Sequence, residues 1–173
     1  MSKENLAELI INDYDSFVEY HKENPEIEIS ETDFSHMNFD NADFSNIDFS
    51  GTTFQEANLS SVSFVDCDLT GVDFSRANLS ECDFSGAILN GTSFNYATVN
   101  FCNFSDSDMA GSNLAEADLT DSDFSTCENL ESARFDESTV WPDNDKLPED
   151  FDCTYSYDLS SLREEDENQQ EQY

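Results

Sequence analysis

The chain repeats a large apolar residue at every fifth position over most of its length. From Phe34 to Phe124 this series has nineteen members without an interruption. Eleven of them are Phe, six are Leu, and the remaining two are Val99 and Met109. An α-helix repeats near 3.6 residues and a β-strand near 2, so a strict period of five belongs to neither. The pattern predicts a repeating unit in which a short extended segment alternates with a turn.

The neighbours of each large residue are restricted as well. The residue two positions before it is small or compact, as at Ala57 and Cys82, and the residue directly before it is Asp or Asn in fourteen of nineteen cases. This pattern resembles the pentapeptide-repeat family, whose unit is written A-(D/N)-L-x-x. Residues 77–81 and 117–121 match that unit at every position, and the resemblance covers roughly residues 30–140.

In that family four pentapeptides form one square coil of a right-handed β-helix, which implies a second period of twenty. Four of the five glycines are spaced by twenty and lie two positions after a large residue: Gly51, Gly71, Gly91 and Gly111. A glycine column is expected where one corner of the coil needs a positive φ, as in a type II turn. The predicted fold class is therefore an all-β solenoid, a right-handed quadrilateral β-helix of about five and a half coils.

The period of twenty also sorts the large residues into interior columns. Two opposite columns are mainly Phe, and the other two are mostly aliphatic, so a narrow interior is filled and leaves no room for a ligand. The predicted Phe columns are Phe44, Phe64, Phe84, Phe104 and Phe124 on one side, and Phe34, Phe54, Phe74 and Phe94 on the other.

The segments before and after the repeats are predicted to cap the open ends of the solenoid. We expect a short helical N-terminal cap over 1–29, the β-helix over 30–140, an irregular C-terminal cap over 141–162 and an acidic disordered tail over 163–173. After Phe124 the large residues slip by one position, to Leu130, Phe135 and Val140. A one-residue bulge near Glu128 or Asn129, with Cys127 inside, accounts for that slip.

The chain is strongly acidic, with 40 Asp and Glu against 6 Lys and Arg and a formal net charge of −34. Residues 31–140 hold 21 acids, opposed only by Arg76 and Arg134. At ~4.8 Å per coil the rod is on the order of 26 Å long, a length over which duplex DNA carries roughly fifteen charges. This similarity favours an acidic rod that imitates DNA, with Asp66, Asp68, Asp106 and Asp108 as candidate partner-binding residues. The acidity is also compatible with the Asp and Asn preference of the repeat itself, with solubility or with salt adaptation.

The resemblance implies a kind of partner. Some pentapeptide-repeat proteins imitate DNA in the DNA-binding saddle of type II topoisomerases such as gyrase. The chain lacks the loop insertion and the long apolar C-terminal helix of the quinolone-resistance branch. The alternative is a protein-interaction scaffold without DNA mimicry. Tyr96 and Phe101 support it, because both are predicted to point outward at corners where most repeats place small or polar residues.

Other kinds of chemistry find little support. Cys67, Cys82 and Cys102 fill small interior positions, and a disulfide between stacked cysteines is disfavoured by parallel side chains and a reducing compartment. His21 and His36 have no Cys or carboxylate partner at metal-ligand spacing, so we interpret them as surface residues. Residues 143–145 are interpreted as a solvated turn rather than a calcium loop.

We therefore expect that the protein is not an enzyme, holds no metal and no cofactor, and does not bind nucleic acid directly. Without an apolar span or a secretion signal, a cytoplasmic protein is expected, with a monomer favoured.

Overall fold

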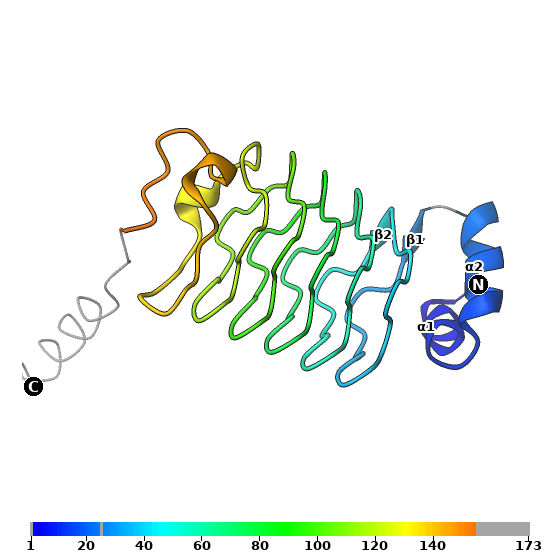
Figure 1. Ribbon diagram of the computed structural model, residues 1–173. Coiled ribbons are helices and arrows are strands. Elements are labelled where there is room, and N and C mark those ends of the chain that lie inside the picture. The colour runs from blue at the N-terminus through cyan, green and yellow to red at the C-terminus, as the bar shows by residue number, and fades with distance from the viewer. Residues whose placement is uncertain (1, 25, 155–173) are drawn as a thin grey trace, which may run out of the picture.

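The computed structural model describes residues 2–24 and 26–154, which form a row of stacked coils with a cap at each end (Figure 1). Two helices, α1 (Lys3–Asn12) and α2 (Tyr14–Glu23), lie at the N-terminal end. Two short 3-10 turns, η1 (Leu130–Ser132) and η2 (Asn144–Lys146), belong to the C-terminal end. The predicted tail over 163–173 and the last part of the predicted C-terminal cap lie outside the described residues.

Successive coils are joined by parallel pairing at a constant offset of twenty residues. Strand β1 (Ile27–Glu28) pairs with β2 (Ile47–Asp48), Ile27 opposite Ile47. Single-residue bridges continue the same offset, from Asp33 with Thr53 to Asp108 with Glu128. Each side of a coil has only three residues between its corners, so the paired segments stay short. The predicted quadrilateral β-helix is confirmed.

From Glu31 to Asp121, every corner of the coil contains a residue with positive φ, two positions after the large residue. Glycines fill this position at Gly51, Gly71, Gly91 and Gly111, with φ between 65° and 67°, and at Gly86, and non-glycine residues adopt it at the remaining corners of this range. At Asn41 φ is 62°, and the N–H of Ala42 donates to the Phe39 carbonyl at 2.9 Å, which is the pattern of a type II turn. The expectation that one corner of the coil needs a positive φ was too narrow, because all four corners have the same geometry.

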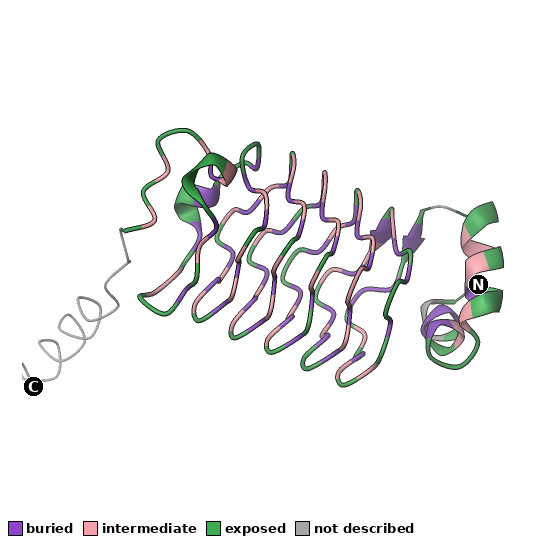
Figure 2. Ribbon diagram, in the orientation of Figure 1, coloured by how far each residue is buried: buried purple, intermediate pink, exposed green. Residues whose placement is uncertain are grey.

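The interior is filled by the predicted columns. All nineteen large residues from Phe34 to Phe124 are buried, and buried segments recur in each coil along the rod (Figure 2). Neighbouring Phe rings stack from coil to coil, with centroids 4.9 Å apart for Phe84 and Phe104 and 5.4 Å apart for Phe54 and Phe74. The interior therefore consists of side chains packed at contact distance.

Small polar residues inside the coil bond to the backbone of the preceding coil. The Cys82 thiol donates to the Leu59 carbonyl at 3.0 Å, and the Thr92 hydroxyl donates to the Leu69 carbonyl at 2.7 Å. Cys67, Cys82 and Cys102 are free, and burial raises the pKa of the Cys67 thiol to about 12. These cysteines are packing residues, as predicted, and Cys82 and Cys102 form no disulfide.

The N-terminal cap has two helices where the apolar spacing indicated one. The Asp13 side chain accepts hydrogen bonds from the backbone and hydroxyl of Ser16, so it ends α1 and caps α2. Phe17 is fully buried against Phe44. The Tyr14 hydroxyl accepts from the Asp43 N–H at 2.8 Å, a backbone group that has no earlier coil to pair with. The cap thus covers both the apolar end and part of the open strand edge.

The C-terminal end contains two insertions rather than one. The bridge offset changes from twenty to twenty-one between Glu128 and Arg134, with Cys127 and Leu130 buried, so the predicted bulge is confirmed. A second change, to twenty-two, precedes Val140, which pairs with Asp118. Val140 is 49% exposed and Thr139 takes the small interior position, so the expectation that Val140 continues the large interior series was wrong. A turn held by the Asp136 side chain, which accepts from the Ser138 N–H, absorbs the extra residue.

The last coil is closed by the segment that follows. Trp141 packs against Phe135 and Phe151, each at a centroid distance of 5.1 Å. The N–H of Phe124 donates to the Lys146 carbonyl at 2.8 Å, so η2 occupies the position that a further coil would take. Both apolar packing and edge pairing therefore end the solenoid.

Candidate functional site

The four sides of the solenoid differ in the residues at the centre of each outer surface. We call one side the acidic face: its central column is Asp48, Asp68, Ile88, Asp108 and Glu128, and Asp66 and Asp106 occupy one of its corners. We call another the asparagine face: its central column is Asn38, Asn58, Asn78, Thr98 and Asp118. Two quarter turns separate the two faces along the chain, so they lie on opposite sides of the coil.

The candidate residues divide between these two faces. Asp66, Asp68, Asp106 and Asp108 come together on the acidic face, as two pairs separated by one coil. Tyr96 and Phe101 occupy the two corners that border the asparagine face, in the same coil as Thr98. The structure thus separates the acidic candidates from the aromatic ones, a distinction that the linear sequence does not reveal.

The carboxylates of the acidic face are held by backbone hydrogen bonds. An oxygen of Asp48 accepts from the Ser50 N–H at 2.8 Å, and an oxygen of Asp68 accepts from the Thr70 N–H at 2.9 Å. Asp108 accepts from the Ala110 N–H at 3.1 Å in the same way. One oxygen of each of these three central carboxylates is therefore fixed at the turn. Within the described residues, no Lys or Arg stands in the columns that form this face.

The hydrogen bond from the side chain to the turn does not require a negative charge. The side-chain oxygens of Asn103 and Asn113 accept the equivalent N–H groups at 3.0 and 3.2 Å. An uncharged Asn thus performs the local structural role as well as Asp does. The predicted turn bonding is confirmed, and it leaves the charge of the acidic face without a local structural explanation.

Gly86 is the one glycine outside the column spaced by twenty, and it lies between Asp66 and Asp106 at the corner of the acidic face. A Cβ at Gly86 would collide with a carboxylate oxygen of Asp66, whose side chain extends over the glycine. Its φ is +67°. The absence of a side chain at Gly86 therefore leaves space for the Asp66 carboxylate at this corner. The contact joins two residues in successive coils, so it could not be predicted from the linear sequence.

Tyr96 belongs to a corner column of side chains that contact one another across coils. The Arg76 guanidinium lies 4.8 Å from the centroid of the Tyr96 ring, and a hydrogen bond with Glu116 raises the pKa of the Tyr96 hydroxyl. Earlier in the same column, His36 Nδ1 lies 3.3 Å from a carboxylate oxygen of Glu56. His36 is a surface residue, and its carboxylate neighbour lies one coil away rather than at ligand spacing in the sequence.

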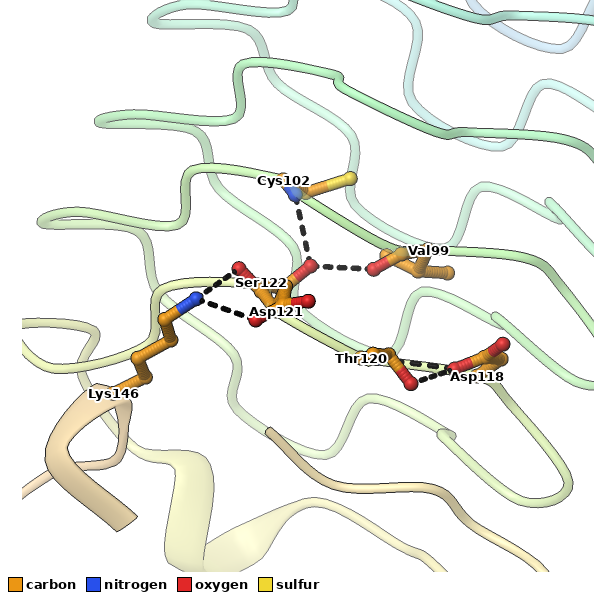
Figure 3. Close-up of polar contacts among 7 residues, drawn as sticks. All are labelled: Val99, Cys102, Asp118, Thr120, Asp121, Ser122 and Lys146. Atoms are coloured by element: carbon orange, nitrogen blue, oxygen red, sulfur yellow. Dashed lines mark hydrogen bonds and ion pairs between the residues drawn. The ribbon is translucent and has the colours of Figure 1, made fainter. Parts of the chain in front are cut away.

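At the corner that contains Phe101, the hydroxyl of Ser122 from the next coil links the backbone groups of Val99 and Cys102 (Figure 3). The Cys102 N–H donates to the Ser122 hydroxyl at 2.8 Å, and that hydroxyl donates to the Val99 carbonyl at 2.5 Å. Beside this corner, Lys146 Nζ reaches from η2 to a carboxylate oxygen of Asp121 at 3.1 Å. The Phe101 side chain itself is 59% exposed.

The asparagine face is nearly neutral along its centre. The Asn58 amide donates to the Asn38 side-chain oxygen at 2.7 Å, and the Asn78 amide donates to that of Asn58 at 3.0 Å. Thr98 follows, and Asp118 is the first charged residue of the column. A run of linked amides therefore forms the floor between the corners that hold Tyr96 and Phe101.

The described residues contain a cavity beside the first coil, but no group of side chains that could hold a metal ion. Within residues 2–24 and 26–154 no group of His, Cys, Asp and Glu side chains could hold a metal ion. In the same residues no helix has the length and apolar character needed to cross a membrane. A cavity of about 450 Å³ lies between the N-terminal cap and the first coil, lined in part by Ile10, Ile11 and Met37. It lies outside the coil, whose interior is filled.

Comparisons with solved structures find other pentapeptide-repeat proteins. A pentapeptide-repeat protein from the Arabidopsis thaliana thylakoid lumen is 29% identical, with 53% of this chain and 67% of that chain covered and a TM-score of 0.45. Rfr23 from the cyanobacterium Cyanothece 51142 is 21% identical, with 70% and 95% covered and a TM-score of 0.44. QnrB1, a plasmid-mediated fluoroquinolone resistance protein, is 19% identical, with 65% and 92% covered and a TM-score of 0.17.

Comparison with curated proteins gives no match. Two family models match the solenoid. The pentapeptide repeat region matches residues 25–94, and the model of eight pentapeptide repeats matches residues 87–125 and 100–139. Together they span the coils from the N-terminal cap to the second insertion, which is well over half of the chain. The chain therefore belongs to the pentapeptide-repeat family.

Proposed function

We propose that this protein is a non-enzymatic acidic rod whose acidic face binds a basic surface of a protein partner. In its most specific form the proposal is DNA mimicry: the rod competes with DNA for a basic DNA-binding groove, such as that of a type II topoisomerase. One observation carries the proposal. The acidic face presents fixed carboxylates on stacked coils, with no Lys or Arg in its columns among the described residues.

The number of negative charges per unit length on the acidic face is similar to that on one side of duplex DNA. Asp48 and Glu128 are four coils apart, or about 19 Å, and the face carries six carboxylates over that length. Duplex DNA of the same length carries about eleven phosphates, of which roughly half face one side. Because Asn serves the turn equally well, this density supports a role for the charge in binding.

The proposal is tested by titrating the protein into a DNA supercoiling reaction of a bacterial gyrase, with and without excess duplex. We expect inhibition, or protection of the enzyme, that weakens as salt rises and is relieved by the added duplex. Absence of any effect up to micromolar protein would rule out the topoisomerase form of the proposal. Such a partner implies a cytoplasmic location, which we propose with it.

A second candidate is a protein-interaction scaffold that makes no use of DNA mimicry. It is favoured by the two exposed aromatic residues, Tyr96 and Phe101, which lie on the side opposite the acidic face. Exposed aromatic side chains often anchor protein interfaces. Pull-down with the wild type and with a Tyr96→Ser, Phe101→Ser double variant separates the two candidates. Retention of every partner by the double variant counts against the aromatic anchor.

A further inference from the structure

Exposed apolar side chains gather along the asparagine face. Five large apolar residues of the described chain are substantially exposed: Ile11, Ile88, Tyr96, Phe101 and Val140. Tyr96 and Phe101 border this face, Val140 extends its central column, and Ile11 lines the cavity beside Asn38 at its other end. Only Ile88 lies on the acidic face. An apolar border around a neutral floor is typical of a protein contact surface.

The two aromatic residues occupy positions that disfavour them. Tyr96 and Phe101 both have φ of 59°, a conformation that bulky side chains adopt at a cost in free energy. Elsewhere the chain fills many corners with Gly, Asn or Asp, which tolerate this conformation better. Two consecutive corners thus combine backbone strain with exposure of an aromatic ring, and both border the same face.

The four sides of the solenoid differ in the charge of their central columns, which affects how closely another acidic chain can approach. The central columns of the other three sides carry Asp33 and Asp73, Asp43 and Asp83, or the carboxylates of the acidic face. The central column of the asparagine face is neutral from Asn38 to Thr98, and its corners hold Arg76 and Lys146 as well as four carboxylates: Glu56, Glu81, Glu116 and Asp121. A second copy of this acidic chain therefore meets a neutral strip here, bordered by charges of both signs.

The two borders of the face are complementary in two successive coils, and in the next coil Lys146 pairs with Asp121, which lies across the face from Glu116. One border carries Arg76 and Tyr96 in successive coils, and the other carries Glu81 and Phe101 in the same two coils. Suppose that two copies lie side by side, in parallel and in register, around a two-fold axis along the rod. Each border then meets the opposite border of the other copy, so Arg76 faces the partner subunit's Glu81 and Tyr96 faces the partner subunit's Phe101.

We propose that the asparagine face is the interface of a parallel, side-by-side homodimer. The two-fold axis passes along the Asn38, Asn58, Asn78 and Thr98 column, and two Arg–Glu pairs and two Tyr–Phe contacts flank it. We expect a dimer that dissociates at roughly micromolar protein, as weak and transient complexes do. The acidic faces of both copies point away from each other and remain free.

The dimer is tested by sedimentation velocity over a range of protein concentrations and salt. We expect the wild type to dimerise as concentration rises, and more strongly at higher salt, because screening reduces the repulsion between two chains of the same charge. A partner that binds the acidic face shows the opposite salt dependence. A wild type that stays monomeric at millimolar concentration overturns the proposal.

A charge exchange tests the predicted arrangement directly. Arg76→Glu and Glu81→Arg alone each place like charges opposite one another and should weaken the dimer by about tenfold. The double variant R76E/E81R restores both pairs and should regain most of the wild-type affinity. Singles that dimerise like the wild type, or a double variant no tighter than the singles, contradict this interface.

Two further variants distinguish an effect on dimerisation from an effect on the folding stability of the single chain. Phe101→Gly removes the aromatic contact at a corner where glycine is favoured, so the dimer should weaken while the melting temperature stays the same or rises. Ile88→Ser removes an exposed apolar residue from the acidic face and should leave dimerisation unchanged. Undiminished dimerisation of Phe101→Gly, or equal weakening by Ile88→Ser, overturns the assignment to the asparagine face.

Discussion

At the scale of the residue, the corner positions accept side chains of very different size despite their positive φ. Each corner from Glu31 to Asp121 holds a residue with positive φ, and glycine fills only five of these positions. The others hold residues as different as Asn41, Glu81 and Phe101. The repeated hydrogen bonds between coils hold these residues in place, so the backbone strain is spread over the whole rod.

A pair of opposite substitutions measures that strain. Phe101→Gly should raise the free energy of unfolding by about 1 kcal/mol, and Gly71→Ala should lower it by a similar amount. A Cβ at Gly71 meets no atom within 4 Å, so its cost is that of the backbone alone. Urea unfolding of the dilute protein gives both values. Ala110→Gly, next to a corner but without positive φ, is the control and should destabilise.

A single interior hydroxyl supports the corner at Phe101. Ser122→Ala leaves the Cys102 N–H and the Val99 carbonyl without the hydroxyl that links them, and should cost about 1–3 kcal/mol in stability. Ser112 provides the matched control, because its buried hydroxyl has no hydrogen-bond partner in the described structure. Ser112→Ala should be neutral or stabilising. Equal losses in the two variants, measured by thermal unfolding, would contradict the assigned role of Ser122.

At the scale of the element, the two caps resolve the problem of open strand edges. The N-terminal cap uses a phenol: Tyr14 accepts from the Asp43 N–H and packs its ring edge-on against Phe44. The C-terminal cap uses the backbone of η2, whose Lys146 carbonyl accepts from Phe124. Both devices satisfy a backbone group that would otherwise invite pairing with another chain.

Tyr14 gives the N-terminal cap a dependence on alkaline pH. Burial raises the pKa of Tyr14 above its ordinary value of 10.0. Its contribution to stability is therefore fully present below pH 10 and is lost as the pH rises through the raised value. Tyr14→Phe should lower stability by about 1 kcal/mol at pH 8 and should lack this alkaline loss. Urea unfolding of both proteins from pH 8 to 11 checks the difference, and parallel pH curves would contradict it.

The elements also show which features a sequence can reveal. The coils were predictable because a period of five, and glycines at a period of twenty, repeat without interruption. The second insertion was not predictable, because Val140 has the apolar character of an interior residue and only the Asp136 turn shifts it outward. The break at Asp13 was hidden in the same way, since the apolar spacing runs through it.

The candidate surfaces were predictable only in part. The outward direction of Tyr96 and Phe101 followed from the repeat, as did the outward direction of Asp66 and Asp106. The contact of Arg76 with Tyr96 joins residues twenty apart and required the stacked coils to be seen. The separation of acids and aromatics onto opposite faces likewise depends on reading the repeat around the coil rather than along the chain.

At the scale of the whole molecule, the net charge of −34 opposes the compact state. Raising sodium chloride from about 0.01 to 0.5 M should therefore increase the melting temperature. A variant with Asp48, Asp68, Asp108 and Glu128 replaced by Asn or Gln should show a smaller increase, because it has four fewer charges to screen. A melting temperature that falls with salt would mean that attractive pairs, such as Lys146 with Asp121, outweigh the repulsion.

The central claim is that the acidic face, rather than net charge alone, binds a basic protein surface. Its most direct test is the affinity for bacterial gyrase, measured by fluorescence anisotropy, of two variants that lose four charges each. One carries Asn at Asp66, Asp68, Asp106 and Asp108, and the other carries Asn at Asp33, Asp43, Asp73 and Asp83 on the neighbouring sides. We predict that the first loses binding and that the second stays close to the wild type. Equal losses in the two variants, or full binding by the first, would contradict the claim.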